Sequence, residues 1–333
     1  MHDEAQRESL EQAAALADES ARARTTGDLE RALAAAERCV ALRRAALGEH
    51  VDVAAALGLV GAARRRRGEL DAALAADAEA LEIYEHVLGD SHPETATAAG
   101  NLSATRRARG EHDAALALAE RALAGLRAAC GADDLRTALA WGNLAAVRRA
   151  RGEHADAIAC GRELVRVRQA VLGDMSLETA AARSTLGSLL AAAGDHAAAL
   201  VEETAALAAR EAQADPRVAL ESLTNLATIH RNLGDAERSL ELQQRALAVQ
   251  RAALGEADPA TTRSRVYVAY TLLRLGRRAP AERLIDEGLR HAPNNEELRG
   301  LKRQLGGVAQ PGFRAPAQGN KSRGNKPRGR GKR

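Results

Sequence analysis

Residues 88–123 read LGDSHPETATAAGNLSATRRARGEHDAALALAERAL, and this stretch decides the fold. Runs of strong helix formers lie on both sides of the turn residue Gly110. In the second run, apolar residues such as Ala115, Ala119 and Ala122 recur at helical spacing, which places them on one stripe. The stretch therefore predicts two amphipathic helices joined by a glycine turn.

The same unit returns about every 42 residues along the chain. Five residues after each turn glycine the side chain is small, and thirteen residues after it stands a Val or a Leu. The turn glycines are Gly27, Gly68, Gly110, Gly152, Gly194, Gly234 and Gly276. Because one helix pair cannot bury its own apolar faces, the repeats predict an all-α, right-handed solenoid of about seven stacked antiparallel helix pairs.

The boundaries between units carry helix-start signals. Asp215-Pro216 and Asp258-Pro259 place an Asp cap before a Pro at the first helical position. The stretch Pro293-Asn294-Asn295 predicts the cap of a closing helix over Glu296–Leu305. We therefore expect residues 1–305 to form the solenoid. Residues 306–333 are rich in Gly, Pro, Lys and Arg, which predicts a basic disordered tail.

Composition agrees with an all-helical chain. Only five residues are aromatic and eight are proline, which disfavours sheet-rich folds. The net charge is +3, and residues 306–333 hold eight Lys and Arg and no acid, so the rest of the chain carries about −5. Three cysteines without a C-x-x-C pair favour a reducing compartment. With no export signal and no apolar run near 18 residues, we expect a cytoplasmic protein without membrane contact.

The columns of glycine, small and large apolar residues resemble the tetratricopeptide repeat. The 42-residue period, together with LGDSHPETA at Leu88–Ala96, is similar to the kinesin-light-chain subtype. The resemblance covers residues 1 to about 305 and implies a non-enzymatic scaffold that binds a protein or peptide. In one column, four before the turn glycine, the family usually has an aromatic residue. Here that column reads Arg64, Arg106, Arg148, Leu190, His230 and Leu272. We expect the arginine stems to cover apolar surface there.

The resemblance also implies that the first helix of each pair lines a concave groove, with a peptide-clamping Asn nine residues before the turn glycine. Asn101, Asn143 and Asn225 match that column, whereas other units carry a different residue there. An Asn amide can donate to and accept from an extended peptide backbone at once. The alternative is that these amides form hydrogen bonds between helices of the chain itself.

A row of arginines lies three residues before the turn glycines. It consists of Arg24, Arg65, Arg107, Arg149 and Arg231. On a helix Asn101 and Arg107 are some 120° apart and bracket a face floored by small residues. Since guanidinium groups pair with carboxylates, we hypothesise a groove for an acidic segment. The alternative is a solvated charged face balanced by local acids.

No motif in the chain predicts chemistry. There is no glycine-rich phosphate loop, no Cys-His or Ser-His-Asp set is suggested by local sequence, and we expect no enzyme activity, cofactor or small-molecule substrate. His112, His154 and His196 share one column. Equivalent atoms of stacked repeats lie roughly 10 Å apart, too far for one metal ion, so we expect no metal site.

The basic tail leaves other functions open. Its cations could neutralise nucleic-acid phosphates, bind an anionic protein, contact the solenoid or remain solvated. The residues concerned include Lys321, Arg323, Lys326, Arg328, Arg330, Lys332 and Arg333. The leading hypothesis is a protein-interaction scaffold. The alternatives are a nucleic-acid-associated adaptor that uses this tail and a regulatory subunit of a separate enzyme.

Overall fold

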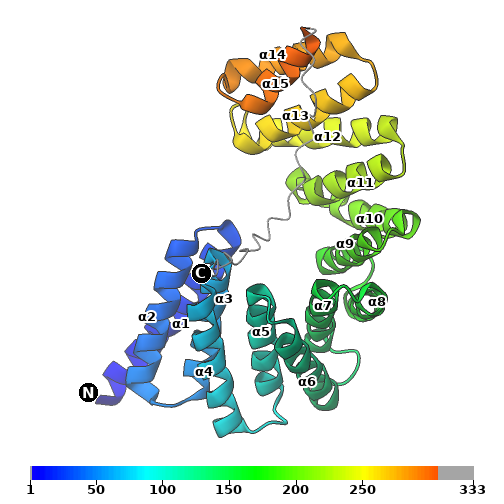
Figure 1. The fold of residues 1–333 in the computed structure, drawn as a ribbon. Helices are drawn as coiled ribbons and strands as arrows, with labels where there is room; N and C mark the ends of the chain where they lie inside the picture. Colours follow the sequence, from blue (N-terminus) through cyan, green and yellow to red (C-terminus); the bar gives the residue numbers. More distant parts are fainter. Residues whose placement is uncertain (1, 307–333) are drawn as a thin grey trace, which may run out of the picture. The chain divides into compact units, whose positions relative to one another are not determined.

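The computed structural model describes residues 2–306, and every regular element in that range is helical (Figure 1). The pairs are α1 (His2–Thr26) with α2 (Leu29–Leu47), α3 (Val51–Arg67) with α4 (Leu70–Leu88), α5 (Pro93–Arg109) with α6 (His112–Cys130), α7 (Leu135–Ala150) with α8 (His154–Leu172), α9 (Leu177–Ala192) with α10 (His196–Glu211), α11 (Leu220–Asn232) with α12 (Ala236–Leu254), and α13 (Pro259–Arg274) with α14 (Arg278–His291). A short 3-10 helix, η1 (Pro216–Ala219), precedes α11, and α15 (Glu296–Leu305) packs against α13 and α14. The predicted all-α class, the seven pairs and the closing helix are confirmed.

The described chain divides into two compact units, which meet in sequence at Ala214 and Asp215. In the first unit each helix contacts the next, and α1, α3, α5 and α7 also contact one another in succession. No two consecutive second helices within residues 2–214 contact each other to that extent. The first helices therefore lie closer together, so the surface they form curves inward. We call the surface of α1, α3, α5 and α7 the first-helix face.

Glycine ends the first helix where its carbonyl groups need donors. Gly110 has φ 85°, in the left-handed region, and its N–H bonds to the Arg107 carbonyl at 3.0 Å. The N–H of Glu111 bonds to the Arg106 carbonyl, also at 3.0 Å. These two bonds satisfy carbonyls that the helix leaves free, and a side chain with a Cβ would be strained at Gly110.

The predicted caps start the helices that follow. The Asp258 side chain accepts from the N–H of Ala260 at 2.7 Å, with Pro259 at the first helical position of α13. In the stretch that opens α5, the cap is His92, whose Nδ1 accepts from the Glu94 N–H at 3.2 Å. Asn295 caps α15.

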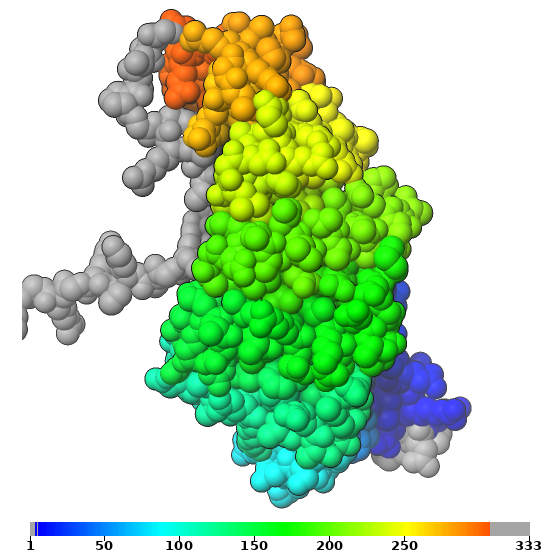
Figure 2. All heavy atoms as spheres, turned by 90° about the vertical axis from the view of Figure 1, so that its right-hand side faces the viewer, coloured from blue at the N-terminus to red at the C-terminus, as the bar shows by residue number. Residues whose placement is uncertain are grey.

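Small residues stand both five positions after and seven positions before each turn glycine, and these two columns are the points at which paired helices touch. Every residue five positions after a turn glycine, from Ala32 to Ala281, is at most 1% exposed. Ser103 on α5 donates to the carbonyl oxygen of Ala115 on α6 at 2.6 Å, so side chain meets backbone across the pair. Side chains close the spaces between the green helices of the first unit (Figure 2). Larger residues in these columns would force the helices apart.

The predictions for residues 307–333 lie outside the described part of the chain, so the basic tail stays a prediction. The single solenoid over residues 1–305 also stays a prediction, because the two units are described separately. Within residues 2–306, no helix combines the length and the apolar character needed to cross a membrane.

Gly61 on α3 makes room for a carboxylate on α4. A Cβ on Gly61 would overlap the carboxylate of Asp77, which Thr105 and Arg65 hold in place. We expect Gly61→Ala to lower the free energy of unfolding by about 1–3 kcal/mol, because relief of the overlap would break those bonds. Urea unfolding measures this free energy.

Gly58→Ala on the same helix is the matched control. Its Cβ would meet only the Asn101 Nδ2 atom at 3.9 Å, an ordinary contact. Since Ala favours a helix over Gly, we expect Gly58→Ala to be neutral or to stabilise by up to about 1 kcal/mol. Equal stability of the two variants would contradict the overlap at Gly61.

Candidate functional site

Two asparagine amides lie on neighbouring helices of the first-helix face. Asn101 on α5 and Asn143 on α7 are half-buried, and neither side chain forms a hydrogen bond with another residue of the described chain. The Nδ2 atom of Asn143 would lie 3.3 Å from a Cβ on Gly100, so this amide reaches across to α5. Both amides are therefore open to an external donor or acceptor. Asn225 belongs to α11 of the second unit.

Arg65 on α3 is held inside the protein. Its Nη1 donates to the Thr105 hydroxyl at 2.8 Å, to the Asp77 carboxylate at 3.3 Å and to the Asn101 carbonyl oxygen at 3.4 Å. The Thr105 hydroxyl in turn donates to Asp77 at 2.5 Å. This arginine has three internal acceptors at its Nη1 and is therefore less available to a ligand than the sequence alone predicts.

The partner of Arg65, Asp77, is a buried acid. The residue is 1% exposed, and its Oδ1 has no hydrogen-bond donor in the described structure. Burial raises the pKa of Asp77, while the Thr105 hydrogen bond and the Arg65 charge oppose that rise. Burial also lowers the pKa of Arg65, and Asp77 offsets part of that change. In each group the charge of the other opposes the effect of burial on the pKa without cancelling it.

The next two arginines of the row have no such partners. Arg107 on α5 and Arg149 on α7 are half-buried and form no hydrogen bond or ion pair with any residue in 2–306. The reason lies one repeat further along the chain. The positions that correspond to Asp77 and Thr105 are Ala119 and Val147 for Arg107, and Gly161 and Leu189 for Arg149. Apolar residues and a glycine have replaced both hydrogen-bonding partners.

These two guanidinium groups lie close enough to disturb each other. Burial lowers the pKa of Arg107, and the charges of Arg149 and Arg65 lower it further. Acids are scarce on the same helices, since α7 has none and Glu94 is the only one on α5. The C-terminal half of the first-helix face therefore carries uncompensated positive charge. The negative end of each helix dipole stabilises these cations only in part.

A pocket of about 320 Å³ adjoins this charge on the N-terminal side of the unit. Its lining includes Arg24, Arg65, Asp77 and Asn101, which come from α1, α3, α4 and α5. Arg24 is half-buried and, like Arg107, has no acid partner in the described chain. The pocket thus joins the arginine row to the first of the two free asparagines. Arg231, on α11, belongs to the second unit.

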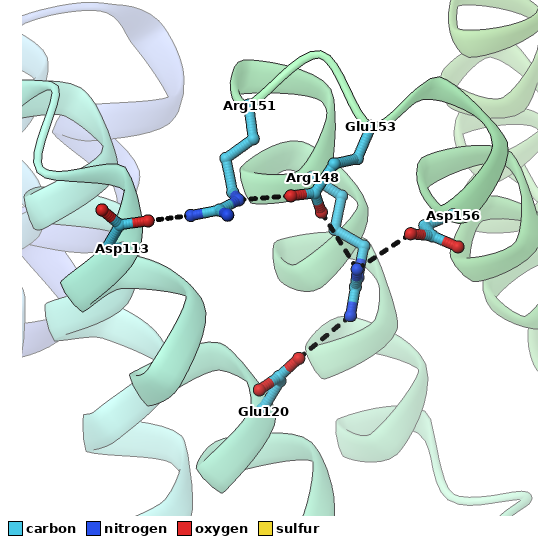
Figure 3. Close-up of polar contacts among 6 residues, drawn as sticks. All are labelled: Asp113, Glu120, Arg148, Arg151, Glu153 and Asp156. Carbon is cyan, nitrogen blue, oxygen red and sulfur yellow. Dashed lines mark hydrogen bonds and ion pairs between the residues drawn. The ribbon is translucent and has the colours of Figure 1, made fainter.

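A separate ionic cluster shows how other arginines of the same unit are satisfied (Figure 3). It joins α6, α7 and α8 through Asp113, Glu120, Arg148, Arg151, Glu153 and Asp156. Arg148 holds Glu120 of the preceding pair at 3.0 Å, and Arg64 holds Glu37 of its preceding pair at 2.6 Å. Two of the three arginines in the usual aromatic column therefore tie neighbouring repeats together, whereas Arg106 pairs with Glu111 of its own repeat.

Within residues 2–306 no three His, Cys, Asp or Glu side chains group in a way that could hold a metal ion. The polar geometry instead offers hydrogen-bond donors and positive charge over a face built from successive helices. Paired helices around glycine turns, with a shared face of first helices, define an α-helical repeat protein.

The family model described as "Tetratricopeptide repeat" matches residues 52–128, 136–212 and 218–294, which is more than half of the chain. The chain belongs to the tetratricopeptide repeat family. The family prediction made from the glycine, alanine and leucine columns is confirmed. Repeats of this family support a protein-interaction scaffold in general.

Solved structures share the fold. BtubC (BKLC) from P. vanneervenii has a TM-score of 0.59 at 24% identity, over 68% of this chain and 92% of that chain. Kinesin light chain TPR-like repeats from Podosopora anserina have a TM-score of 0.54 at 19% identity, over 64% of this chain and 97% of that one. The apo form of RapI has a TM-score of 0.66 at 11% identity, over 88% and 81%. No curated protein matches the chain.

The raised pKa of Asp77 has a consequence for stability. Between the ordinary Asp pKa, about 3.9, and the raised value, the native state binds more protons than the unfolded state. This contribution is therefore present at low pH and is lost as pH rises through the native pKa. We expect the stability of the wild type relative to Asp77→Asn to fall with rising pH, in urea unfolding between about pH 4 and pH 7.

Asp18→Asn on the exposed side of α1 is the control for that series. It makes the same chemical change at an exposed position, so it accounts for the effect that removal of one carboxylate has on the whole protein. A constant difference between wild type and Asp77→Asn across the series would contradict the raised pKa.

Proposed function

We propose that this protein is a scaffold whose first-helix face binds an acidic segment of a partner protein across α5 and α7. The observation that carries the proposal is the pair Arg107 and Arg149, which are half-buried, lie near each other and have no acid within the described chain.

A carboxylate from a ligand would relieve both the lost hydration of these arginines and the repulsion between them. Both residues are half-buried, and the charge of Arg149 adds to burial in lowering the pKa of Arg107. Charge-assisted hydrogen bonds to a carboxylate replace the lost hydration, and the negative charge screens the repulsion. Bidentate geometry suits the planar guanidinium, so Asp and Glu side chains fit better than a diffuse negative field.

The free amides of Asn101 and Asn143 would bind the backbone of the same segment. One amide can donate to a peptide carbonyl and accept from a peptide N–H, which holds a chain without reading its side chains. The asparagines thus contribute general affinity, and the arginines contribute the preference for acid.

The internal partners of Arg65 assign it a supporting role in this proposal. Through Asp77 and Thr105 it ties α3 to α4 and α5, so it shapes one wall of the face. Asn225 and Arg231 offer a related pair on α11 of the second unit. The first unit carries the proposal because two adjacent helices there present the same free residues.

The double variant Arg107→Glu/Arg149→Glu tests this role. The probe is a pool of fluorescein-labelled twelve-residue peptides, each with four glutamates at random positions, followed by fluorescence anisotropy at low salt. One lost charged hydrogen bond costs about 1.5–3 kcal/mol, so we expect binding to weaken by about 100-fold or more.

Arg38→Glu/Arg162→Glu is the matched control, with the same change in net charge. Both residues are exposed on second helices and form no ion pair in the described chain. We expect this variant to bind the pool within about twofold of the wild type, apart from long-range screening effects. If both double variants lost binding equally, attraction would come from net charge and the proposed face would be wrong.

A further inference from the structure

We propose that the first-helix face selects a particular register, namely acidic side chains at every third residue of a segment in the polyproline II conformation. This inference rests on the proposed function and adds to it the spacing and the backbone conformation of the ligand.

The spacing follows from the repeat. Arg107 and Arg149 occupy the same position of two helices that contact each other directly. Packed helices have axes about 8–10 Å apart, so the two guanidinium groups are separated by about that distance. Asn101 and Asn143 also share one position of the same two helices. A ligand that crosses α5 and α7 therefore meets the same two contacts twice, about one helix spacing apart.

Only some backbone conformations match that spacing on a single side. In polyproline II, three residues make one turn and each rises 3.1 Å, so residues i and i+3 project to the same side about 9.3 Å apart. In a β-strand, same-side residues lie about 6.7 Å or about 13 Å apart, which fits poorly. In an α-helix, residues i and i+7 share a side at about 10.5 Å.

The asparagine amides distinguish the two conformations that fit. An α-helix uses its own N–H and carbonyl groups internally, so it offers little to a free amide. A polyproline II segment has no internal hydrogen bonds and exposes every backbone polar group that it has. Asn101 and Asn143 are free within the described chain and recur at the spacing of the arginines. The extended, unpaired backbone is the better complement.

The floor of the face favours a narrow ligand. Between Asn101 and Arg107 on α5 the surface residue is Ala104, and Ala108 follows on the same helix. Side chains on a helix lean toward its N-terminus, which directs the stem of Arg107 over Ala104 toward Asn101. A thin backbone can lie there with its acids directed at the arginines.

The row ends after two contacts, which sets the length of the recognised element. On the α3 side, Asp77 already neutralises Arg65. On the α9 side, the positions of the Arg and the Asn are taken by Ala191 and Thr185. Two adjacent sites thus require two acidic side chains in the ligand. The shortest recognised sequence is acid-x-x-acid, and the residues on either side of it need carry no charge.

Peptides of equal composition test the register. Each has twelve residues with two glutamates, and prolines and alanines elsewhere, with the glutamates at i,i+1, at i,i+2 or at i,i+3. A fourth peptide is an alanine-based helix with glutamates at i,i+7. Relative Kd values come from NMR titration of the full chain at low salt. We expect the i,i+3 peptide to bind about tenfold more tightly than each of the others, because only it engages both arginines and both amides.

Asn101→Leu/Asn143→Leu is the accompanying variant, chosen because Leu59 occupies the same column naturally. We expect it to keep the attraction for acids and to lose the preference for the i,i+3 peptide over the helical one. A variant that keeps the full preference would overturn the role of the amides and with it the conformational part of the proposal.

The remaining outcomes separate this inference from the proposed function. Equal binding of all four peptides, abolished in Arg107→Glu/Arg149→Glu, would overturn the register and leave the acidic-segment function standing. Tightest binding of the i,i+7 peptide would show a helical ligand and would also overturn the register. No binding of any acidic peptide, including the random pool, would overturn both.

Discussion

Close contact between paired helices is the constraint on which the rest of the structure depends. The helices of each pair meet at alanine, glycine and serine, where a hydroxyl such as that of Ser103 reaches the backbone of the partner helix. With five aromatic residues in the whole chain, little bulk is available to separate them. Arg210 and Arg265 are buried, but the other arginines within residues 2–306 do not enter the core. Their stems cover it and their heads reach acids at its rim, as Arg148 reaches Glu120.

Because the helices pack so tightly, one buried acid constrains the residues around it. Asp77 fits only because Gly61 lies opposite, and its charge decides the state of Arg65. Glu203 lies at the same position of α10, opposite Gly187, and is also buried. Where that position holds Ala119, the arginine above it has no partner. The charge of the first-helix face thus depends on the residues at the position of Asp77, which belong to the second helices packed under that face.

Much of the fold could be predicted from periodicity, because helix pairing imposes size limits at fixed positions. The glycine turns, the small columns and the cap at Asn295 all follow from local rules that act within one repeat. The pairing of Arg65 was missed, since it depends on Asp77 and Thr105 from two other helices. A signal was present in Asp77, which is charged where the neighbouring repeats carry Ala36 and Ala119. The division near Ala214 also had a signal, the 40-residue spacing between Gly194 and Gly234.

A repeat protein offers an internal comparison that a single domain lacks. Arg65, Arg107 and Arg149 occupy the same position of successive first helices, so the side chains that pack under each one can be compared directly. Arg65 shows an arginine at this repeat position with internal hydrogen-bond partners. Its Nη1 has three acceptors within 3.4 Å. Arg107 and Arg149 lack those acceptors while keeping the burial that makes acceptors valuable. Two adjacent, unpaired and half-buried cations lower the stability of the free protein. A ligand that supplies the missing carboxylates would remove that cost on binding.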